Sequence, residues 1–337
     1  MSTSPDTAAC YRPADAIALL VGLRVEDQLE ALAGSCLLLD LQQRPAGDEL
    51  AQLTPLLAQL PCPIMGVGAQ TVPEALAINL DCVLDDEKCL PALCRNIANA
   101  PIAAMTLVQL SRAIEQLDVM AALDMESVTY ASLQGGSEYQ AWLREYRAEA
   151  WPAISGELPV LVTRDQDRLL ITLNRPELRN SISVEVRDAL VEALSLAAQD
   201  NCIKSVVLQG AGKCFSVGGE LREFGSVPDT ASGHLIRSLR LPGRWLARIA
   251  SRCEARVHGA CIGAGVELPA FAQRVVAKPN AYFQLPEIQF GLIPGAGGCV
   301  SIAKRIGRHR FNQLALSGKR INAELALEWG LVDAIDG

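Results

Sequence analysis

The sequence predicts an α/β protein, in which short buried strands alternate with amphipathic helices. Short apolar runs that suit strands buried on both faces are separated by longer segments of helical period. Several of these runs end in a glycine-rich turn that leads into a helix, the arrangement found where open α/β sheets bind ligands. The chain has 337 residues, of which 50% are hydrophobic, so it holds enough material for two domains or one large α/β unit.

Composition and charge argue against several classes of protein. The net charge of −8 argues against a nucleic-acid partner. No apolar run approaches the ~20 residues of a membrane helix, and residues 1–16 lack a basic region followed by an apolar core. The 11 cysteines form no Cys-x-x-Cys pair, and His234, His258 and His309 form no metal-ligand pattern. We therefore expect a cytoplasmic protein with reduced thiols, no signal peptide, no membrane contact and no bound metal.

Residues 16–80 have the pattern of a β-α-β-α-β unit. The expected strands are 16–23, 36–41 and 62–69, and the expected helices are 25–34 and 48–60. The strands are apolar throughout, which favours a parallel sheet covered on both faces. This region contains no phosphate-binding glycine loop and no pair of carboxylates beside glycines.

Residues 87–150 are expected to be helical. The four helices are predicted at 87–100, 105–117, 120–134 and 137–150, with a break at Gln134-Gly135-Gly136-Ser137. The second helix has an apolar face, because Leu107, Leu110, Ile114 and Leu117 recur at steps of three and four residues. The block shows no site of its own. Residues 151–159, with two prolines and a glycine, are predicted to form a linker.

A second unit begins after the linker. We expect a hairpin of strands 158–164 and 168–175, a helix over 183–199, and strands over 205–210 and 256–263. Either Ser181 or Ser183 is suited to cap the helix. The strand at 205–210 is followed by a glycine-containing loop and a helix start, so it offers backbone N–H groups at the carboxyl end of the sheet.

Two glutamates in this unit lie in apolar, glycine-rich surroundings. Glu267 follows the turn over 259–265, and Glu287 precedes the loop over 291–298. Two carboxylates beside free backbone N–H groups are the components of acid–base chemistry on a carbonyl compound. The plain alternative is one glutamate on a surface loop and one capping a helix.

Four sequence blocks carry a resemblance to a known family. They are LNRPELRNSIS, KCFSVGGEL, HGACIGAGVEL and FQLPEIQFGLIPGAGG, in this order. Together they resemble the enoyl-CoA hydratase/isomerase (crotonase) superfamily. The resemblance implies that residues 160–337 form a crotonase-like β-β-α spiral that takes a coenzyme A thioester as substrate, with no other cofactor. It also implies an oxyanion hole made by the backbone N–H groups of Gly219 and Ala264, the latter at a place where the family often has glycine.

The resemblance also implies roles for the two glutamates. Family members that hydrate enoyl-CoA carry both, so we expect a hydratase in which Glu267 holds and activates water and Glu287 transfers a proton to the α-carbon. The alternatives are a Δ3-Δ2 enoyl-CoA isomerase, a CoA-thioester hydrolase, or a non-catalytic scaffold that binds CoA. Pro269, two residues after Glu267, is expected to weaken any helix there.

Further residues are candidates for substrate contacts. Arg175 and Arg179 lie near the expected position of the nucleotide, although a solvated surface pair is equally plausible. The remaining candidates are Phe215, Gly218, Leu221, Phe224, Gly263, Leu292 and Ile293. For the apolar members of this set, core packing is the alternative. Cys214 and Cys261 have no expected activating partner, so neither is predicted to be a nucleophile.

The order of the parts along the chain is unusual. Crotonase-like proteins normally continue past the GLVD sequence into helices that form a trimer, whereas this sequence ends at Gly337; segments within 90–146 resemble those helices. We therefore interpret 1–150 as a degenerate crotonase-like α/β half ending in helices and lacking a site, 151–159 as a linker, and 160–337 as the catalytic core. The protein is expected to form a homotrimer or hexamer. We also expect residues 90–146 to fold back on the catalytic core, within the chain or across a subunit contact.

Overall fold

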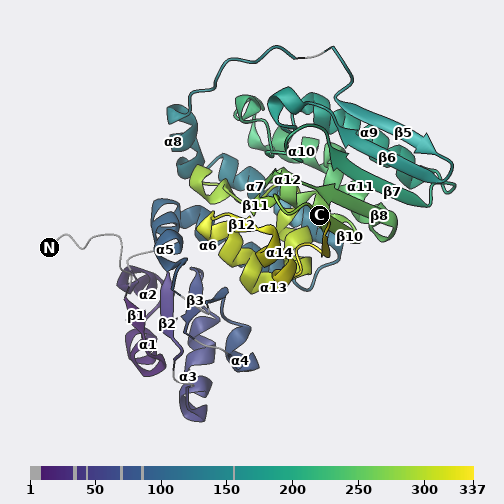
Figure 1. The fold of residues 1–337 in the computed structure, drawn as a ribbon. Helices are drawn as coiled ribbons and strands as arrows, with labels where there is room; N and C mark the ends of the chain where they lie inside the picture. The colour runs from purple at the N-terminus through teal and green to yellow at the C-terminus, as the bar shows by residue number, and fades with distance from the viewer. Residues whose placement is uncertain (1–8, 33–35, 43–44, 69–70, 85–86, 155) are drawn as a thin grey trace.

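The structure, a computed structural model, describes residues 9–32, 36–42, 45–68, 71–84, 87–154 and 156–337. Its N-terminal part is a four-stranded parallel sheet in the order β1-β2-β3-β4, purple to blue in Figure 1. The strands are β1 (Cys10–Tyr11), β2 (Leu37–Asp40), β3 (Ile64–Val67) and β4 (Cys82–Leu84), and the helices are α1 (Pro13–Leu20), α2 (Val25–Ala31), α3 (Gly47–Leu57) and α4 (Glu74–Ala77).

The strand predicted over 16–23 is wrong, because this segment is mostly the helix α1. Pro13 occupies the first turn, where its missing N–H costs nothing, and Ala16 and Leu20 lie four residues apart on one fully buried face. The sequence also failed to predict β1 and β4, which have only two and three residues. The predicted ends at Gly34 and Ala69 lie outside the described residues.

The small sheet is buried on both faces. Leu37 and Leu39 point to a core shared with α1 and α3, whereas Leu38 and Met65 point to a larger core on the other face. This alternation is the period-2 pattern of a strand. The larger core also contains buried side chains of the C-terminal unit, so the second face of the sheet packs toward that unit.

Four helices follow the sheet, as the sequence predicts. They are α5 (Leu90–Asn99), α6 (Pro101–Ile114), α7 (Val119–Gln134) and α8 (Ser137–Glu145). Asp118 caps α7 by accepting hydrogen bonds from the N–H groups of Met120 and Ala121. Within the described part of the chain, no single helix has the length and apolar character to cross a bilayer; α5 and α6 meet both criteria only as a pair, bent by 109°.

The C-terminal unit contains two sheets, drawn from teal to yellow in Figure 1. The six-stranded sheet has the order β13-β10-β8-β7-β6-β5, and the three-stranded sheet has the order β12-β11-β9. The strands are β5 (Val160–Asp165), β6 (Arg168–Leu173), β7 (Ser205–Gly210), β8 (Cys253–Val257), β9 (Ala260–Ile262), β10 (Arg274–Ala277), β11 (Tyr282–Gln284), β12 (Ile321–Asn322) and β13 (Ala334–Ile335). The α-helices are α9 (Val184–Gln199), α10 (Thr230–Arg240), α11 (Pro242–Ile249), α12 (Ala264–Glu267), α13 (Gly298–Ser317) and α14 (Ala323–Trp329). The 3₁₀ turns are η1 (Pro176–Leu178), η2 (Leu221–Glu223), η3 (Ala250–Arg252), η4 (Pro269–Phe271) and η5 (Glu287–Phe290).

The single strand predicted over 256–263 is two strands that belong to different sheets. β8 lies in the large sheet and β9 in the small one, and the chain turns between them at Gly259, which has a φ of +57°. A Cβ at this position would lie 2.4 Å from the carbonyl oxygen of Lys213, so only glycine fits. The hairpin of β5 and β6 is antiparallel as predicted. Of the two candidate caps of α9, Ser183 forms the cap, through the N–H of Val186.

The helical block folds back on the C-terminal unit within the chain. α5 and α6 pack against α13, and α7 packs against α10. Leu107, Leu110 and Ile114 of the predicted apolar face are buried in the same cluster as Val257 and Phe311. The helices therefore share one hydrophobic core with residues 160–337. The proposed kinship of the N-terminal half with a crotonase unit stays a prediction.

A buried ionic network anchors α13 to the small sheet. α13 bends at Gly307, whose φ of +78° breaks the helix, and Arg308 follows the bend. The Arg308 guanidinium contacts the fully buried Asp81 at 3.4 Å and Glu115 at 3.0 Å, and it donates to the carbonyl of Leu80. Arg112 of α6 binds the same Asp81 carboxylate. Removing one partner of such a network would leave a charge buried without compensation.

Because the helical block completes the core of the C-terminal unit, residues 157–337 expressed alone should be insoluble or aggregated. Without 1–150, the apolar faces of α13 and α10 would meet water. Co-expression with 1–150 should restore a soluble complex, measured by gel filtration and circular dichroism. A soluble, folded and active 157–337 fragment would contradict this expectation.

Candidate active site

A cavity of about 650 Å³ lies where several loops of the C-terminal unit meet the helical block. Its walls come from residues 217–222, 262–264, 267–268, 286–287 and 295–296, from Arg237 of α10, and from Tyr130 of α7. Most of these segments lie at the ends of strands or at the starts of short helices, so the cavity is lined by backbone groups as well as side chains.

Two glycine-containing loops lie against each other at one wall of the cavity. The N–H of Ile262 donates to the carbonyl of Ser216 at 3.1 Å. A Cβ on Gly218, whose φ is +88°, would lie 2.5 Å from the carbonyl oxygen of Ile262, and a Cβ on Gly265 would lie 2.3 Å from that of Ser216. Glycine is therefore required for the close approach of the two loops.

The two loops present the predicted pair of backbone donors. Gly219 lies at the end of one loop, and Ala264 is the first residue of α12, where a helix leaves its N–H groups without an internal partner. Across the described residues, no acceptor engages the N–H of either residue, and both residues line the cavity. The cavity thus offers two unpaired N–H donors to a ligand oxygen.

Glu267 is the last residue of α12, and its side chain is only 2% exposed. Its Oε2 accepts hydrogen bonds from the N–H groups of Ala296 at 2.7 Å and Gly298 at 2.8 Å. Burial raises the pKa of Glu267 to about 7, while the two N–H donors act in the opposite direction. A carboxyl of this pKa changes charge near neutral pH.

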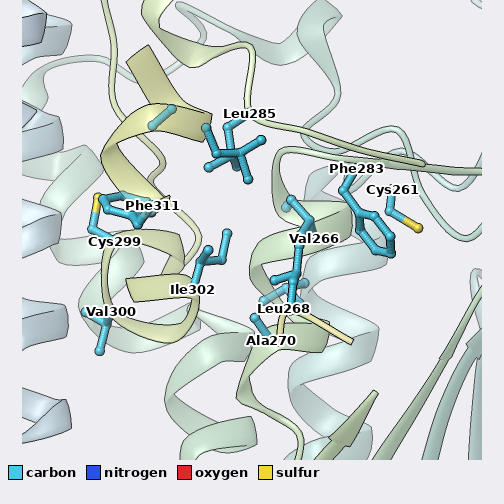
Figure 2. Packing of buried hydrophobic residues seen from close by; sticks show 14 of the residues in the cluster. Cys261, Val266, Leu268, Ala270, Phe283, Leu285, Cys299, Val300, Ile302 and Phe311 are labelled. Atoms are coloured by element: carbon cyan, nitrogen blue, oxygen red, sulfur yellow. The ribbon is translucent and has the colours of Figure 1, made fainter. Parts of the chain in front are cut away.

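The predicted effect of Pro269 is visible beside Glu267. The α-helix ends after a single turn at Glu267, and the chain continues as the 3₁₀ turn η4, which Pro269 opens. Figure 2 shows how apolar side chains fix this short element: Val266 and Leu268 lie among buried residues, facing Ile302 of α13. The packing holds the Glu267 backbone although the helix itself is short.

Glu287 begins η5 and lines the same cavity. Its Oε2 is buried and has no hydrogen-bond partner within the described residues. Burial, and next the negative charge of Glu267, hold the pKa of Glu287 well above its usual range. Its Oε1 lies so close to the turn at Gly263 that a Cβ there would approach it to 2.7 Å. These surroundings favour the protonated form of Glu287, and its Oε2 is free to meet a ligand.

The two predicted arginines differ in their surroundings. The Arg175 guanidinium is buried and donates to the carbonyl of Glu157, and it forms an ion pair with Glu185 at 3.0 Å. It does not line the cavity, so it fastens the linker rather than facing a ligand. Arg179 is exposed, adopts a φ of +54°, and does line the cavity.

The predicted apolar candidates also divide into two groups. Leu221 and Phe224 line the cavity, together with the predicted glycines of both loops. Phe215, Leu292 and Ile293 are buried in the core and are not part of the wall. For these three residues, core packing is the correct interpretation.

Sequence reasoning missed several residues of the wall. Tyr130 of α7 and Arg237 of α10 face each other there, with the guanidinium carbon 4.6 Å from the ring centroid. Phe290 also lines the wall, and it packs against Trp142 of α8 with 4.8 Å between ring centroids. Tyr130 lies in a block without motifs, so only the fold brings it to the site.

The cysteines and the histidine near the site have surroundings that favour a structural role. Burial raises the pKa of the Cys214 and Cys261 thiols, which keeps both protonated and poorly nucleophilic. The Nε2 atom of His258 lies 3.0 Å from the carbonyl oxygen of Gly212. In the described part of the chain, no three metal-binding side chains cluster together.

A protein-family comparison decides the relationship. The model described as enoyl-CoA hydratase/isomerase matches residues 164–337, slightly more than half of the chain. The chain belongs to the enoyl-CoA hydratase/isomerase family. The predicted membership of the crotonase superfamily is therefore confirmed, and the protein is a crotonase-family acyl-CoA enzyme.

Individual relatives of this family agree with the assignment. The 2,3-dehydroadipyl-CoA hydratase of Escherichia coli (strain K12) is 36% identical over 178 residues, which are 52% of this chain and 68% of that protein. The trans-2-decenoyl-acyl-carrier-protein isomerase of Streptococcus mutans is 31% identical over 177 residues, or 51% of this chain and 67% of that one. The crystal structure of an enoyl-CoA hydratase of Mycobacterium smegmatis superposes with a TM-score of 0.50 at 30% identity, covering 53% of this chain and 70% of the other. The predicted crotonase-like fold is thus confirmed for the C-terminal unit.

The close contact of Gly263 with Glu287 leads to a prediction. Gly263→Ala adds a Cβ 2.7 Å from Oε1 of Glu287 at a φ of +51°. The backbone cost should be about 1–2 kcal/mol, and the displaced carboxyl should lower turnover of an acyl-CoA substrate on the order of 10²-fold. Thermal unfolding and steady-state kinetics measure the two effects separately.

Gly307→Ala is the matched control for Gly263→Ala. Gly307 has a φ of +78°, but a Cβ there meets no atom within 4 Å. This variant should lose a similar amount of stability and keep its turnover. Equal turnover of the two variants would show that the contact with Glu287 has no role.

Proposed function

We propose that this protein is an enoyl-CoA hydratase, which adds water across the α,β double bond of a 2-enoyl-CoA thioester. One observation carries the proposal: Glu267 and Glu287 line a single cavity that also offers the unpaired N–H groups of Gly219 and Ala264. A hydratase needs a base for water, an acid for the α-carbon and donors for the thioester oxygen, and this set supplies all three.

The proposed reaction proceeds through an enolate. Gly219 and Ala264 donate their N–H groups to the thioester oxygen, so the β-carbon becomes electrophilic. Glu267 removes a proton from water while the water oxygen bonds to the β-carbon, and the π electrons move to the thioester oxygen. The enolate then collapses as its α-carbon takes the proton of Glu287. Transfer of a proton from Glu267 to Glu287 through solvent resets the enzyme.

The charge states of the two carboxyls support these roles. Glu267, with a pKa of about 7, is substantially ionised at neutral pH and suits a general base. Burial and the charge of Glu267 hold the pKa of Glu287 well above its usual range, which favours its protonated form and suits a general acid. Neighbouring carboxyls whose environments place them in different charge states are typical of acid–base pairs.

An isomerase is the second candidate within the same family. Glu287 has one buried oxygen without a partner, so in its ionised form it is able to take a proton from one carbon of an acyl chain and return it to another without help from Glu267. The relative from Streptococcus mutans is named as an isomerase. If the protein converts a 3-enoyl-CoA to the 2-enoyl isomer but does not hydrate a 2-enoyl-CoA, isomerisation is favoured over hydration.

Glu267→Gln and Glu287→Gln should each lower the rate of crotonyl-CoA hydration on the order of 10²-fold or more. The loss of ultraviolet absorbance of the enoyl thioester measures the rate. In the unsubstituted enzyme, activity should rise as the pH increases through about 7, because Glu267 must be ionised to act as a base. Hydration at an unchanged rate by Glu267→Gln would rule out its role, and unaltered thioester affinity in both variants is the check on folding.

Gly219→Pro tests the backbone donor. The substitution removes the N–H and should cost about 3 kcal/mol of transition-state stabilisation, in addition to strain in the loop. Gly219→Ala is the control, because it keeps the N–H and places a Cβ 3.2 Å from the Phe224 ring. Steady-state kinetics should show a far larger loss for proline than for alanine; a folded proline variant with normal activity would exclude this donor.

A further inference from the structure

One face of helix α7 covers the glycine-rich loop that leads into α13. Leu123, Glu126 and Tyr130 lie on this face at steps of three and four residues. The Tyr130 ring packs so closely that a Cβ on Gly295 would lie 2.3 Å from it, and a Cβ on Gly297 would lie 3.3 Å from Leu123. A segment of the N-terminal half is therefore in contact with the loop that binds Glu267.

Glu126, between these two contacts, shares the backbone of this loop with Glu267. Its side chain is only 1% exposed. Its Oε1 accepts from the N–H of Gly297 at 2.7 Å, and its Oε2 accepts from the N–H of Cys299 at 2.9 Å. Glu267 accepts from the two alternate residues, Ala296 and Gly298. Four consecutive N–H groups thus serve two buried carboxyls in strict alternation.

This alternation couples the side chains of Glu126 and Glu267 through the backbone of residues 296–299. The segment is the start of α13, where N–H groups lack internal partners and a carboxyl is stabilised. Without Glu126, the N–H groups of Gly297 and Cys299 would be buried without an acceptor, which is unfavourable. The segment would then move to find other partners, and the donors of Glu267 would move with it.

We propose that Glu126 is a positioning residue for Glu267, so that a helix of the N-terminal half completes the active site. By binding the N–H groups of Gly297 and Cys299, Glu126 fixes the segment whose other two N–H groups orient the Glu267 carboxylate. The inference rests on the proposed function, in which Glu267 is the base that activates water. It gives the N-terminal half a role in catalysis in addition to its role in the core.

Several charged and titratable groups face this pair. They are Glu287 of η5, Cys299 of α13, Tyr130 of α7 and Arg237 of α10. Burial, and then the charge of Glu267, raise the pKa of Glu126 itself. Removing the Glu126 carboxyl releases this segment, so the N–H groups of Ala296 and Gly298, which lower the pKa of Glu267, would move away from it. Because burial already favours the protonated form of Glu126, the loss of these donors outweighs the loss of its charge, and the pKa of Glu267 should rise.

The test uses Glu126→Gln and Glu126→Ala in the full chain. Glutamine keeps one acceptor oxygen and alanine keeps none, so the loss should be graded, with kcat falling on the order of 10-fold or more in the alanine variant. KM for crotonyl-CoA should change little, because Glu126 is not part of the cavity wall. The acid limb of the pH–kcat profile should move to higher pH by about one unit.

Leu133→Ala is the matched control for general damage to α7. Leu133 is buried on the same helix, but within the described residues it forms no hydrogen bond with residues 296–299. It should lower the melting temperature and leave the pH profile unchanged. If the Glu126 variants also lose stability without a change in the pH profile, the role of Glu126 is structural only, and the proposal is overturned.

A second measurement keeps the inference separate from the proposed function. The side-chain carboxyl of Glu267 can be titrated in the free protein by ¹³C NMR, with Glu267→Gln as the assignment control. Its pKa should be higher in Glu126→Gln, which has lost one acceptor oxygen, than in the unsubstituted protein. An unchanged pKa in this near-isosteric variant would overturn the proposal, whether or not the protein hydrates crotonyl-CoA.

Discussion

The structure depends on the four N–H groups at the start of α13. Burying a carboxyl without hydrogen bonds is costly, and this segment supplies two donors each to Glu267 and Glu126. The arrangement needs glycine at 295 and 297, since side chains there would collide with Tyr130 and Phe271. It also needs α7 packed against the loop. The geometry of the active-site region therefore depends on the packing of the helical block.

Helix α13 connects this region with the small N-terminal sheet. Its first turn binds the two carboxyls, and its second half, beyond the bend at Gly307, carries Arg308 into the ionic network around Asp81. Asn312 extends the same contact, donating to the carbonyl of Asp81 at 3.1 Å. The bend aims one helix at two different partners, which explains a glycine with positive φ at a place where nothing crowds its Cα.

The sequence was most informative where chemistry restricts the choice of residues. Gly218, Gly219, Glu267 and Glu287 lie together as predicted because close backbone approach and acid–base chemistry leave recognisable patterns. Phe215, Leu292 and Ile293 could not be assigned, because apolar residues look the same in a core and in a pocket wall. Helix α1 was mistaken for a strand, since a short apolar run does not distinguish the two periods.

Other parts of the site could not be read from the sequence at all. Tyr130 reaches the cavity only because α7 packs on α10, a contact between distant segments. Glu126 left one signal: it is an acid on the face of α7 that also carries Leu123, where an apolar residue is normal. This pattern indicates that a buried carboxyl needs hydrogen-bond donors, but it does not indicate which loop provides them.

The contact between the helical block and α13 has a consequence during synthesis. The block is made first, and its partners α10 and α13 follow more than 80 residues later along the chain. At about 5–20 residues per second, α5 to α7 wait for several seconds or longer with their apolar faces uncovered on the ribosome. The nascent chain is therefore a natural client for chaperones that hold exposed helices, and it becomes independent of them only when α13 has emerged.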